Sequence, residues 1–162
     1  MNIKFSSVLA AGVIGIALHA ATASAAEYAV INLSTNVDAS VDATWKKIGG
    51  YCDIAAWLKL SCVLTSGTGD VGTVRRLADR IDEVMVAKTA HSYTYTQPTT
   101  TILYHGTLEV VADGKDHAKI LYNLIWDQAP LTSDDAKTKD RDQRTKSFTA
   151  ALANMKAIVE AK

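Results

Sequence analysis

The segment FTAALANMKAIV, residues 148–159, is the most strongly amphipathic part of the C-terminal region of this chain. Its apolar residues recur at i, i+3, i+4, i+7, i+10 and i+11, which is the spacing of a single buried stripe on a helix. These residues are Phe148, Ala151, Leu152, Met155, Ile158 and Val159. No glycine or proline interrupts the chain from Thr132 to Lys162. The pattern predicts one long helix with a face that must pack against another layer.

The start of this helix is expected at Thr132 or Ser133, because a hydroxyl side chain followed by two aspartates is typical of a helix N-terminus. Between that start and Phe148, the sequence AKTKDRDQRTK is strongly charged. We interpret this half as a solvated helix, with the alternative that it covers the mouth of a pocket.

The layer beneath the helix is predicted from a succession of strand-like segments. Residues 28–34, YAVINLS, alternate in polarity and are rich in β-branched side chains, and more such segments follow from Ser61 onward. They are SCVLTSG, GTVRRL, IDEVMVAKTA, SYTYTQ, TILYHGTLEVVADG and HAKILYNLIWDQ. In the last segment, one face holds Ala118, Ile120, Tyr122, Leu124 and Trp126. Asp113-Gly114 is a hairpin signal between the final two strands.

Two short helices are expected after the first strand. Val41, Trp45 and Ile48 recur at i, i+4 and i+7, and Gly49-Gly50 ends this helix. A second helix covers about residues 52–58. We therefore predict an α+β chain with a curved antiparallel sheet of about seven strands wrapped on a long C-terminal helix, and two short helices after strand 1. This is the helix-grip arrangement.

The first 25 residues have the layout of a secretory signal peptide. A single positive residue, Lys4, precedes an uncharged run and small residues that end at Ala25. We expect cleavage after Ala25, which leaves residues 26–162 as a single domain in the bacterial periplasm, without stable membrane insertion. The chain holds 17 basic and 17 acidic residues, so the mature part has a formal charge of −1 once Lys4 is removed. This balance gives no indication of a nucleic-acid partner.

Cys52 and Cys62 are the only cysteines of the chain. Because an isolated pair in an exported protein is normally oxidised, we predict a disulfide that joins the second short helix to the following strand. A zinc site would need further ligands at CxxC or HxxxH spacing, and a thioredoxin-like site would need Cys-x-x-Cys. The sequence has neither pattern. No metal and no cofactor are predicted.

Several motifs, taken in order, are similar to those of one known superfamily. VDATWKKIGGYCDIAAWLKLSC, residues 41–62, resembles the start of SRPBCC proteins, the START and birch-pollen-allergen superfamily, in the polyketide cyclase/dehydrase-like branch that bacteria often export. GTVRRL with Glu83 following resembles the Gly-x-x-Arg strand of that branch, SYTYTQP its Tyr-x-Tyr strand, and SFTAALANMKAI its terminal helix. The resemblance covers nearly the whole mature chain. It implies a helix-grip fold with a ligand cavity between sheet and helix, and it does not imply an enzyme.

Arg75, Arg76 and Glu83 are the polar residues of greatest interest. A turn centred on Asp79 would place Arg75 opposite Glu83, whereas a two-residue turn would place Arg76 there. The plain interpretation is an ordinary cross-strand salt bridge. Inside a cavity, the pair could orient a ligand, and Glu83 could act as a base. The family resemblance favours Arg75 as the matching arginine.

Aromatic residues with polar groups supply the rest of the expected cavity. The later strands hold Tyr93, Tyr95, Tyr104, Tyr122 and Trp126. All of these except Tyr95 are predicted to face the ligand, and Trp57 is expected at the cavity entrance. The predicted ligand-binding set is thus Trp57, Arg75, Glu83, Tyr93, Tyr104, Tyr122 and Trp126.

Three functions are compatible with this sequence. The leading hypothesis is a periplasmic binding protein that holds a small apolar or amphipathic molecule without catalysis. The second is a polyketide cyclase/dehydrase-like enzyme that uses Glu83. The third is an accessory protein with a periplasmic enzyme as its partner, since exported MxaD-like proteins associated with methanol oxidation resemble this chain in general design.

Overall fold

The computed structural model describes residues 25–161 of the chain. The predicted signal peptide, residues 1–25, therefore lies outside the described residues except for its last position. Within the described range, no helix combines the length and the apolar character that a membrane crossing requires.

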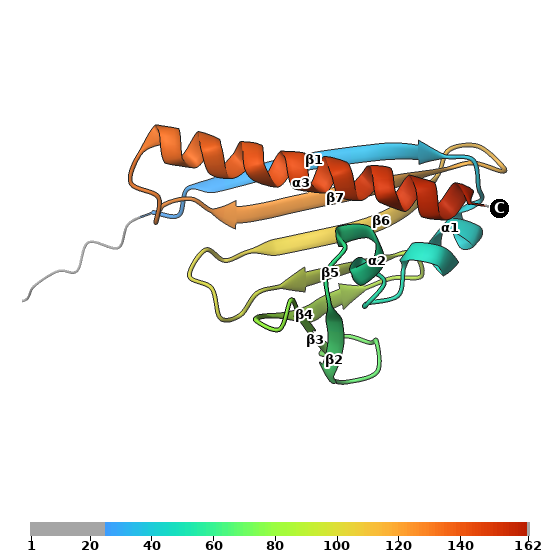
Figure 1. Ribbon diagram of the computed structural model, residues 1–162, viewed down its shortest axis with the longest axis horizontal. Helices are drawn as coiled ribbons and strands as arrows, with labels where there is room; N and C mark the ends of the chain where they lie inside the picture. Colours follow the sequence, from blue (N-terminus) through green and yellow to red (C-terminus); the bar gives the residue numbers. More distant parts are fainter. Residues whose placement is uncertain (1–24, 162) are drawn as a thin grey trace, which may run out of the picture.

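An antiparallel sheet of seven strands forms the main layer, and three helices accompany it within residues 25–161 (Figure 1). The elements in chain order are β1 (Tyr28–Val37), α1 (Val41–Ile48), α2 (Ile54–Leu58), β2 (Cys62–Ser66), β3 (Val74–Leu77), β4 (Ile81–Lys88), β5 (Ser92–Thr96), β6 (His105–Ala112), β7 (Ala118–Asp127) and α3 (Asp134–Glu160). The strand order is β1-β7-β6-β5-β4-β3-β2. This α+β architecture is the helix-grip fold that the sequence predicts.

The C-terminal helix α3 lies along one face of the sheet, as Figure 1 shows. Its N-terminus is capped by Ser133, whose side chain accepts a hydrogen bond from the backbone N–H of Ala136 at 3.2 Å. Its buried residues are Ala151, Leu152, Met155 and Val159. All four lie in the second half of the helix, with Phe148 and Ile158 packed partly buried beside them. The predicted apolar stripe is confirmed.

The covered face of the sheet carries most of the core. The inward residues of β7 are Ala118, Ile120, Tyr122, Leu124 and Trp126. Each of them is at most 1 % exposed, so the predicted inward face is confirmed. Antiparallel partners in register share a face, and accordingly Leu108 of β6 opposes Tyr122 and is also buried.

The short helix α2 begins at Ile54, slightly later than the sequence predicts. The Asp53 side chain closes a turn before it, since its Oδ2 accepts a hydrogen bond from the Gly50 N–H at 2.6 Å. Cys52 lies in this turn and forms a disulfide with Cys62, the first residue of β2. The predicted cysteine pairing is confirmed, and it connects the start of α2 to the next strand.

The strand β6 begins at His105 and not near Thr101, where the sequence pattern begins it. The preceding residues form a loop instead, in which the backbone oxygen of Tyr104 accepts hydrogen bonds from the Gln97 N–H at 3.2 Å and from Thr96 Oγ1 at 3.0 Å. These bonds take the place of strand pairing. They also hold Gln97 and Tyr104 close together at one end of the sheet.

The hairpin between β3 and β4 decides the register of two charged residues. Ala78 and Asp79 have positive φ angles of 47° and 57° in a loop that covers residues 78–80. Arg75 therefore lies opposite Glu83. Of the two registers that the sequence allowed, the structure has the one centred on Asp79.

Candidate functional site

A buried ion pair lies on the covered face of the sheet. Arg75 donates from Nε to Glu83 Oε2 at 2.8 Å, and its Nη2 lies 2.6 Å from the same oxygen. Arg75 is 0 % exposed and Glu83 is 2 % exposed. The next pair along these strands, Arg76 with Asp82, is partly exposed, because successive strand residues face opposite sides. Arg75 and Glu83 thus form the cross-strand ion pair that the sequence predicts, and the pair is buried.

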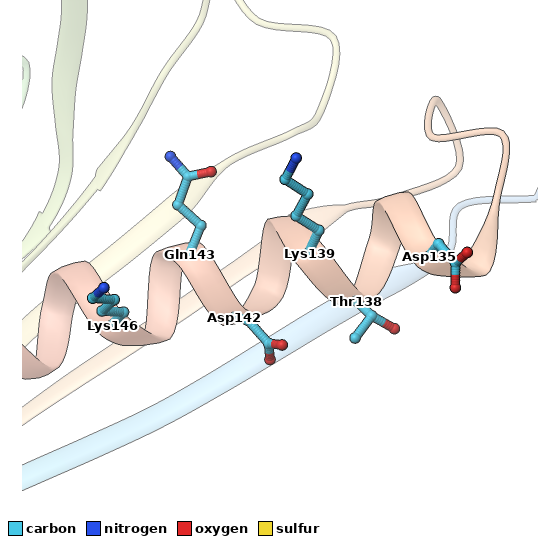
Figure 2. A pocket seen from close by; sticks show the side chains of 6 residues that line it. All are labelled: Asp135, Thr138, Lys139, Asp142, Gln143 and Lys146. Atoms are coloured by element: carbon cyan, nitrogen blue, oxygen red, sulfur yellow. The ribbon is translucent and has the colours of Figure 1, made fainter.

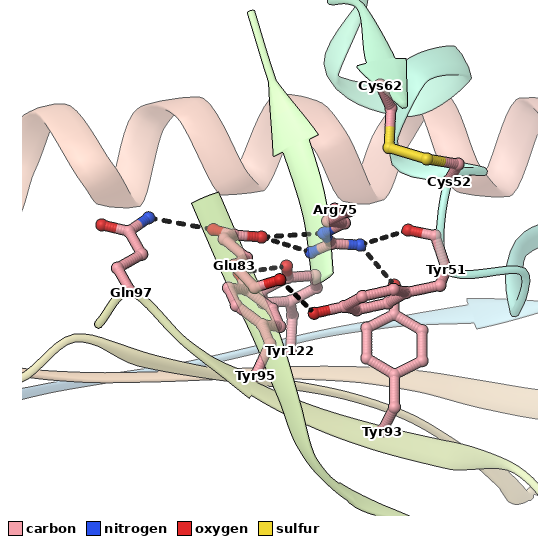
Figure 3. A network of polar contacts seen from close by, with 9 residues as sticks. All are labelled: Tyr51, Cys52, Cys62, Arg75, Glu83, Tyr93, Tyr95, Gln97 and Tyr122. Atoms are coloured by element: carbon pink, nitrogen blue, oxygen red, sulfur yellow. Dashed lines mark hydrogen bonds and ion pairs between the residues drawn. A yellow bond between two sulfur atoms is a disulfide. The ribbon is translucent and has the colours of Figure 1, made fainter. Parts of the chain in front are cut away.

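Further hydrogen bonds hold both partners of this pair (Figure 3). Gln97 Nε2 donates to Glu83 Oε1 at 2.9 Å, so both carboxylate oxygens accept hydrogen bonds. Arg75 Nη1 donates to the backbone oxygen of Tyr51 at 2.5 Å and to the Tyr93 hydroxyl at 3.4 Å. A buried charge pair needs partners for its other donors and acceptors as well, and this network supplies most of them. Arg75 Nη2 has its charge contact with Glu83 but no hydrogen bond of its own.

Tyrosine rings surround the guanidinium of Arg75. Its Cζ lies 4.2 Å from the ring centroid of Tyr51, 4.6 Å from that of Tyr95 and 5.6 Å from that of Tyr93, all within cation–π range. Burial alone lowers the pKa of Arg75, but its interactions with Tyr93 and Glu83 outweigh burial and raise the pKa above its usual value. The side chain is therefore charged in the folded protein.

Tyr95 connects this network to β6 and β7. Its hydroxyl lies 2.7 Å from the hydroxyl of Tyr122, and burial raises the pKa of both phenols well above the usual value. Both groups stay protonated, so one donates to the other. The Tyr95 ring lies over Gly106, its register partner in β6, where a Cβ would be 2.4 Å from Tyr95 Cζ. The missing side chain of Gly106 leaves the space that the ring occupies.

Gly106→Ala is therefore expected to destabilise the protein by about 1–3 kcal/mol, because the new methyl group displaces the Tyr95 ring. Urea unfolding measures this difference. In a Tyr95→Leu background, the same substitution should cost less than about 1 kcal/mol, since the ring that it strikes is gone. An equal cost in both backgrounds would contradict this account of the glycine.

A pocket of about 180 Å³ opens between this network and the helices. Its apolar lining consists of Ile54, Leu58, Leu60, Leu77, Ile81 and Phe148. The side chains with polar groups in its lining are Glu83, Tyr95, Gln97, Tyr104 and Arg144. A groove of about 390 Å³ adjoins the pocket beside α3 and shares Ile81, Arg144 and Phe148 with it. The pocket and the groove together are the candidate site.

Comparison with solved structures identifies the fold. The Zhui aromatase/cyclase of Streptomyces sp. R1128 matches with a TM-score of 0.68 and 14 % identity, over 83 % of this chain and 94 % of that one. XoxI of Bacillus cereus matches with a TM-score of 0.66 and 19 % identity, over 82 % of this chain and 96 % of that one. The chain shares the helix-grip fold with these proteins. No family model matches the chain, and no curated protein matches it.

A plant enzyme shares the same helix-grip architecture. Truncated norcoclaurine synthase of Thalictrum flavum matches with a TM-score of 0.62 and 20 % identity, over 87 % of this chain and 99 % of that one. The resemblance that the sequence motifs indicate is thus confirmed for the fold. At these identities, the likeness establishes an architecture and not an activity.

The structure places the predicted ligand-binding residues in several different surroundings. Glu83 and Tyr104 line the pocket, and Arg75 lies behind Glu83 without lining it. Tyr93 lines a separate depression of about 390 Å³ beside Gly49 and Gly50. The remaining members, which line none of these openings, are Trp57, Tyr122 and Trp126.

The placement of Trp57 at a cavity entrance is wrong. Its ring is 0 % exposed and packs against Tyr122 with 5.8 Å between the ring centroids. Tyr122 also packs against Phe148, with 4.7 Å between centroids. These rings fill the middle of the interior, so Tyr122 is a core residue. Trp126 is 1 % exposed and also belongs to the core. The pocket beside Gln97 is lined by neither Trp57 nor Tyr122.

Tyr95, Gln97 and Arg144 line the pocket although they are absent from the predicted set. Tyr95 lies two residues after Tyr93 on the same strand face, so alternation alone could have identified it. Arg144 lies four residues before Phe148 and shares its helix face. For Arg144, the alternative that the charged half of the helix covers a pocket mouth is therefore correct. No sequence pattern marks Gln97, which lies in a loop.

One larger hollow in the described part of the chain does not offer a comparable site. A hollow of about 500 Å³ lies along the first half of α3, and Figure 2 shows that all six of its residues belong to that one helix. They are Asp135, Thr138, Lys139, Asp142, Gln143 and Lys146. A hollow bounded by a single helix is an open surface groove. Within residues 25–161, no three His, Cys, Asp or Glu side chains are placed to hold a metal ion.

Proposed function

We propose that the protein binds a small amphipathic molecule, about the size of one aromatic ring, in the pocket beneath α3, and that it does so without catalysis. This proposal rests on the pocket, because an apolar recess with a few polar groups at fixed positions is typical of small-molecule sites. An aromatase/cyclase and a norcoclaurine synthase with the same fold support a small-molecule ligand. We further propose that the protein acts in the periplasm, and the Cys52–Cys62 disulfide supports an oxidising compartment.

The volume of the pocket limits the size of the ligand. About 180 Å³ is smaller than the roughly 300–1,000 Å³ of sites that hold drug-sized molecules. A cavity of about 150 Å³ with an apolar lining is nevertheless sufficient to bind benzene. A single substituted ring therefore fits the pocket, whereas a longer molecule would have to extend into the adjoining groove.

The hydrogen bonds of Glu83 favour binding over the alternative of an enzyme that uses this residue as a base. A general base needs an oxygen within hydrogen-bond reach of the proton that it removes. Here one oxygen accepts from Arg75 at 2.8 Å and the other from Gln97 at 2.9 Å. Burial raises the pKa of the Tyr104 hydroxyl, so this group stays protonated in the pocket lining and can hydrogen-bond a ligand.

Phenol at about ten times its dissociation constant is expected to raise the melting temperature by about 4 °C, because binding at that concentration adds about 1.4 kcal/mol to the free energy of unfolding. Leu60→Phe should abolish this shift, because the larger side chain fills the pocket. Leu64→Phe is the control, since Leu64 is 40 % exposed on β2 and lies outside the pocket. Differential scanning fluorimetry of the wild type, Leu60→Phe and Leu64→Phe measures the melting temperature with and without phenol.

Two results together would contradict the binding proposal. One is the absence of a thermal shift with a library of single-ring compounds. The other is native mass spectrometry of freshly purified protein that shows no bound molecule. An equal shift for the wild type and Leu60→Phe would place the binding site elsewhere in the molecule.

A further inference from the structure

Arg144 lies where the pocket meets the groove and lines both. Its Nε donates to Asp140 Oδ1 at 3.0 Å. Its Cζ lies 4.9 Å from the ring centroid of Trp126 and 5.3 Å from that of Tyr104. One carboxylate and two aromatic rings thus hold the guanidinium in a defined position at the mouth of the pocket.

The terminal amino groups of Arg144 remain available for a ligand. Within residues 25–161, its hydrogen bonds to protein atoms come from Nε alone, and its side chain is 26 % exposed. Nη1 and Nη2 form a planar fork that matches the two oxygens of a carboxylate. Because the side chain is already oriented, it loses little conformational freedom when it binds an anion.

Asp140 offsets only part of the positive charge at this position. Its Oδ2 accepts hydrogen bonds from Trp126 Nε1 at 2.7 Å and from Gln128 Nε2 at 3.4 Å. The groove also contains Arg80, so its lining carries two positive charges and one negative charge. A net positive mouth favours a ligand whose negatively charged end lies there.

The inner end of the pocket differs in charge from its mouth. Glu83 is balanced by Arg75 behind it, and the other polar groups there, those of Tyr95, Gln97 and Tyr104, are uncharged. A hydroxyl or an apolar ring edge suits this end better than an anion, because a second carboxylate beside Glu83 would be repelled.

We propose that Arg144 orients the ligand, and that the pocket takes a small aromatic acid with its carboxylate on Arg144 and its ring directed towards Tyr95. This inference rests on the proposed binding function and adds the charge and the orientation of the ligand. Arg144 is a specificity-determining residue of the site, because only an anionic ligand uses both of its free amino groups.

The test compares 4-hydroxybenzoate with its neutral isostere 4-hydroxybenzamide by isothermal titration calorimetry near neutral pH. The acid is expected to bind about tenfold more tightly than the amide to the wild type. Arg144→Gln should remove this preference and change the affinity for the amide by less than about twofold. Arg144→Lys should keep part of the preference, since the charge remains and the fork is lost. Arg141→Gln, on the exposed side of α3, is the matched control and should behave as the wild type.

Different outcomes separate this inference from the proposed function. Equal binding of the acid and the amide by the wild type would overturn the role of Arg144 and leave the binding function in place. If Arg144→Gln still binds the acid more tightly than the amide, the role of Arg144 is likewise overturned and the binding function stays in place. If neither probe binds while phenol does, the inference alone fails. If no compound of the single-ring library binds and no molecule co-purifies with the protein, both fail.

Discussion

Replacing Arg75 by alanine is expected to lower the free energy of unfolding by about 3–5 kcal/mol. The guanidinium is 0 % exposed and balances the buried carboxylate of Glu83, 2.6 Å away. Without it, the carboxyl group of Glu83 loses its buried partner, and the backbone oxygen of Tyr51 loses its donor. Urea unfolding followed by circular dichroism measures the change.

Arg76→Ala is the matched control for this prediction, because Arg76 is the next residue of β3 and faces the opposite side of the sheet. It pairs with Asp82, and the two side chains are 47 % and 29 % exposed. Exposed pairs of this kind contribute about 0–1 kcal/mol. Equal losses in Arg75→Ala and Arg76→Ala would contradict the interior position of the Arg75–Glu83 pair.

The double variant Arg75→Met/Glu83→Leu separates charge from packing. Removing both partners leaves no unpaired charge, and replacement of a buried pair by apolar residues is often neutral or stabilising. We therefore expect the double variant to recover most of the stability that Arg75→Ala loses. A double variant as unstable as Arg75→Ala would show that the hydrogen bonds to Tyr51 and Tyr93 matter more than the balance of charge.

Cys52→Ala/Cys62→Ala is expected to lower the free energy of unfolding by about 3 kcal/mol. The disulfide joins residues that are 10 positions apart and closes a loop that contains α2. This helix has five residues, too few to be stable alone, and it carries the buried side chains of Ile54 and Trp57. The bridge restricts the unfolded chain and so favours the packed position of these residues.

Urea unfolding of the double cysteine variant and of reduced wild-type protein measures this effect, and the two should agree within about 1 kcal/mol. The pairing is also tested by counting thiols in denatured, unreduced protein. No reactive thiol is expected. Two thiols would contradict the disulfide, and a double variant as stable as the oxidised wild type would contradict its stabilising role.

The local sequence pattern was sufficient for the elements of the fold and for their buried faces. In β7, alternation alone marks Tyr122 and Trp126 as inward, because side chains of a strand point to opposite faces in turn. In α3, the spacing from Ala151 to Val159 marks the buried stripe for the same kind of geometric reason. The disulfide was predictable because two cysteines allow only one pairing.

Two features of the site could not be predicted from the local sequence, because they depend on a loop conformation and on how helix and sheet pack together. The register that pairs Arg75 with Glu83 depends on the backbone of the loop at Asp79, and the residue types allow more than one turn there. The position of Arg144 at the mouth of the pocket depends on where α3 crosses the sheet. It lies in a segment that is strongly charged and mostly exposed, so local composition did not distinguish it from the rest of that segment.

The sequence by itself thus determined which strand residues point inward, and only the tertiary structure decided which of these face open space. Tyr93, Tyr95 and Tyr122 all share the inward phase, and Tyr95 alone lines the pocket beneath α3. The difference arises because Trp57 of α2 fills the volume beside Tyr122. Periodicity specifies the direction of a side chain, whereas a cavity is the volume that side chains from several distant elements leave unfilled, and no single segment contains that information.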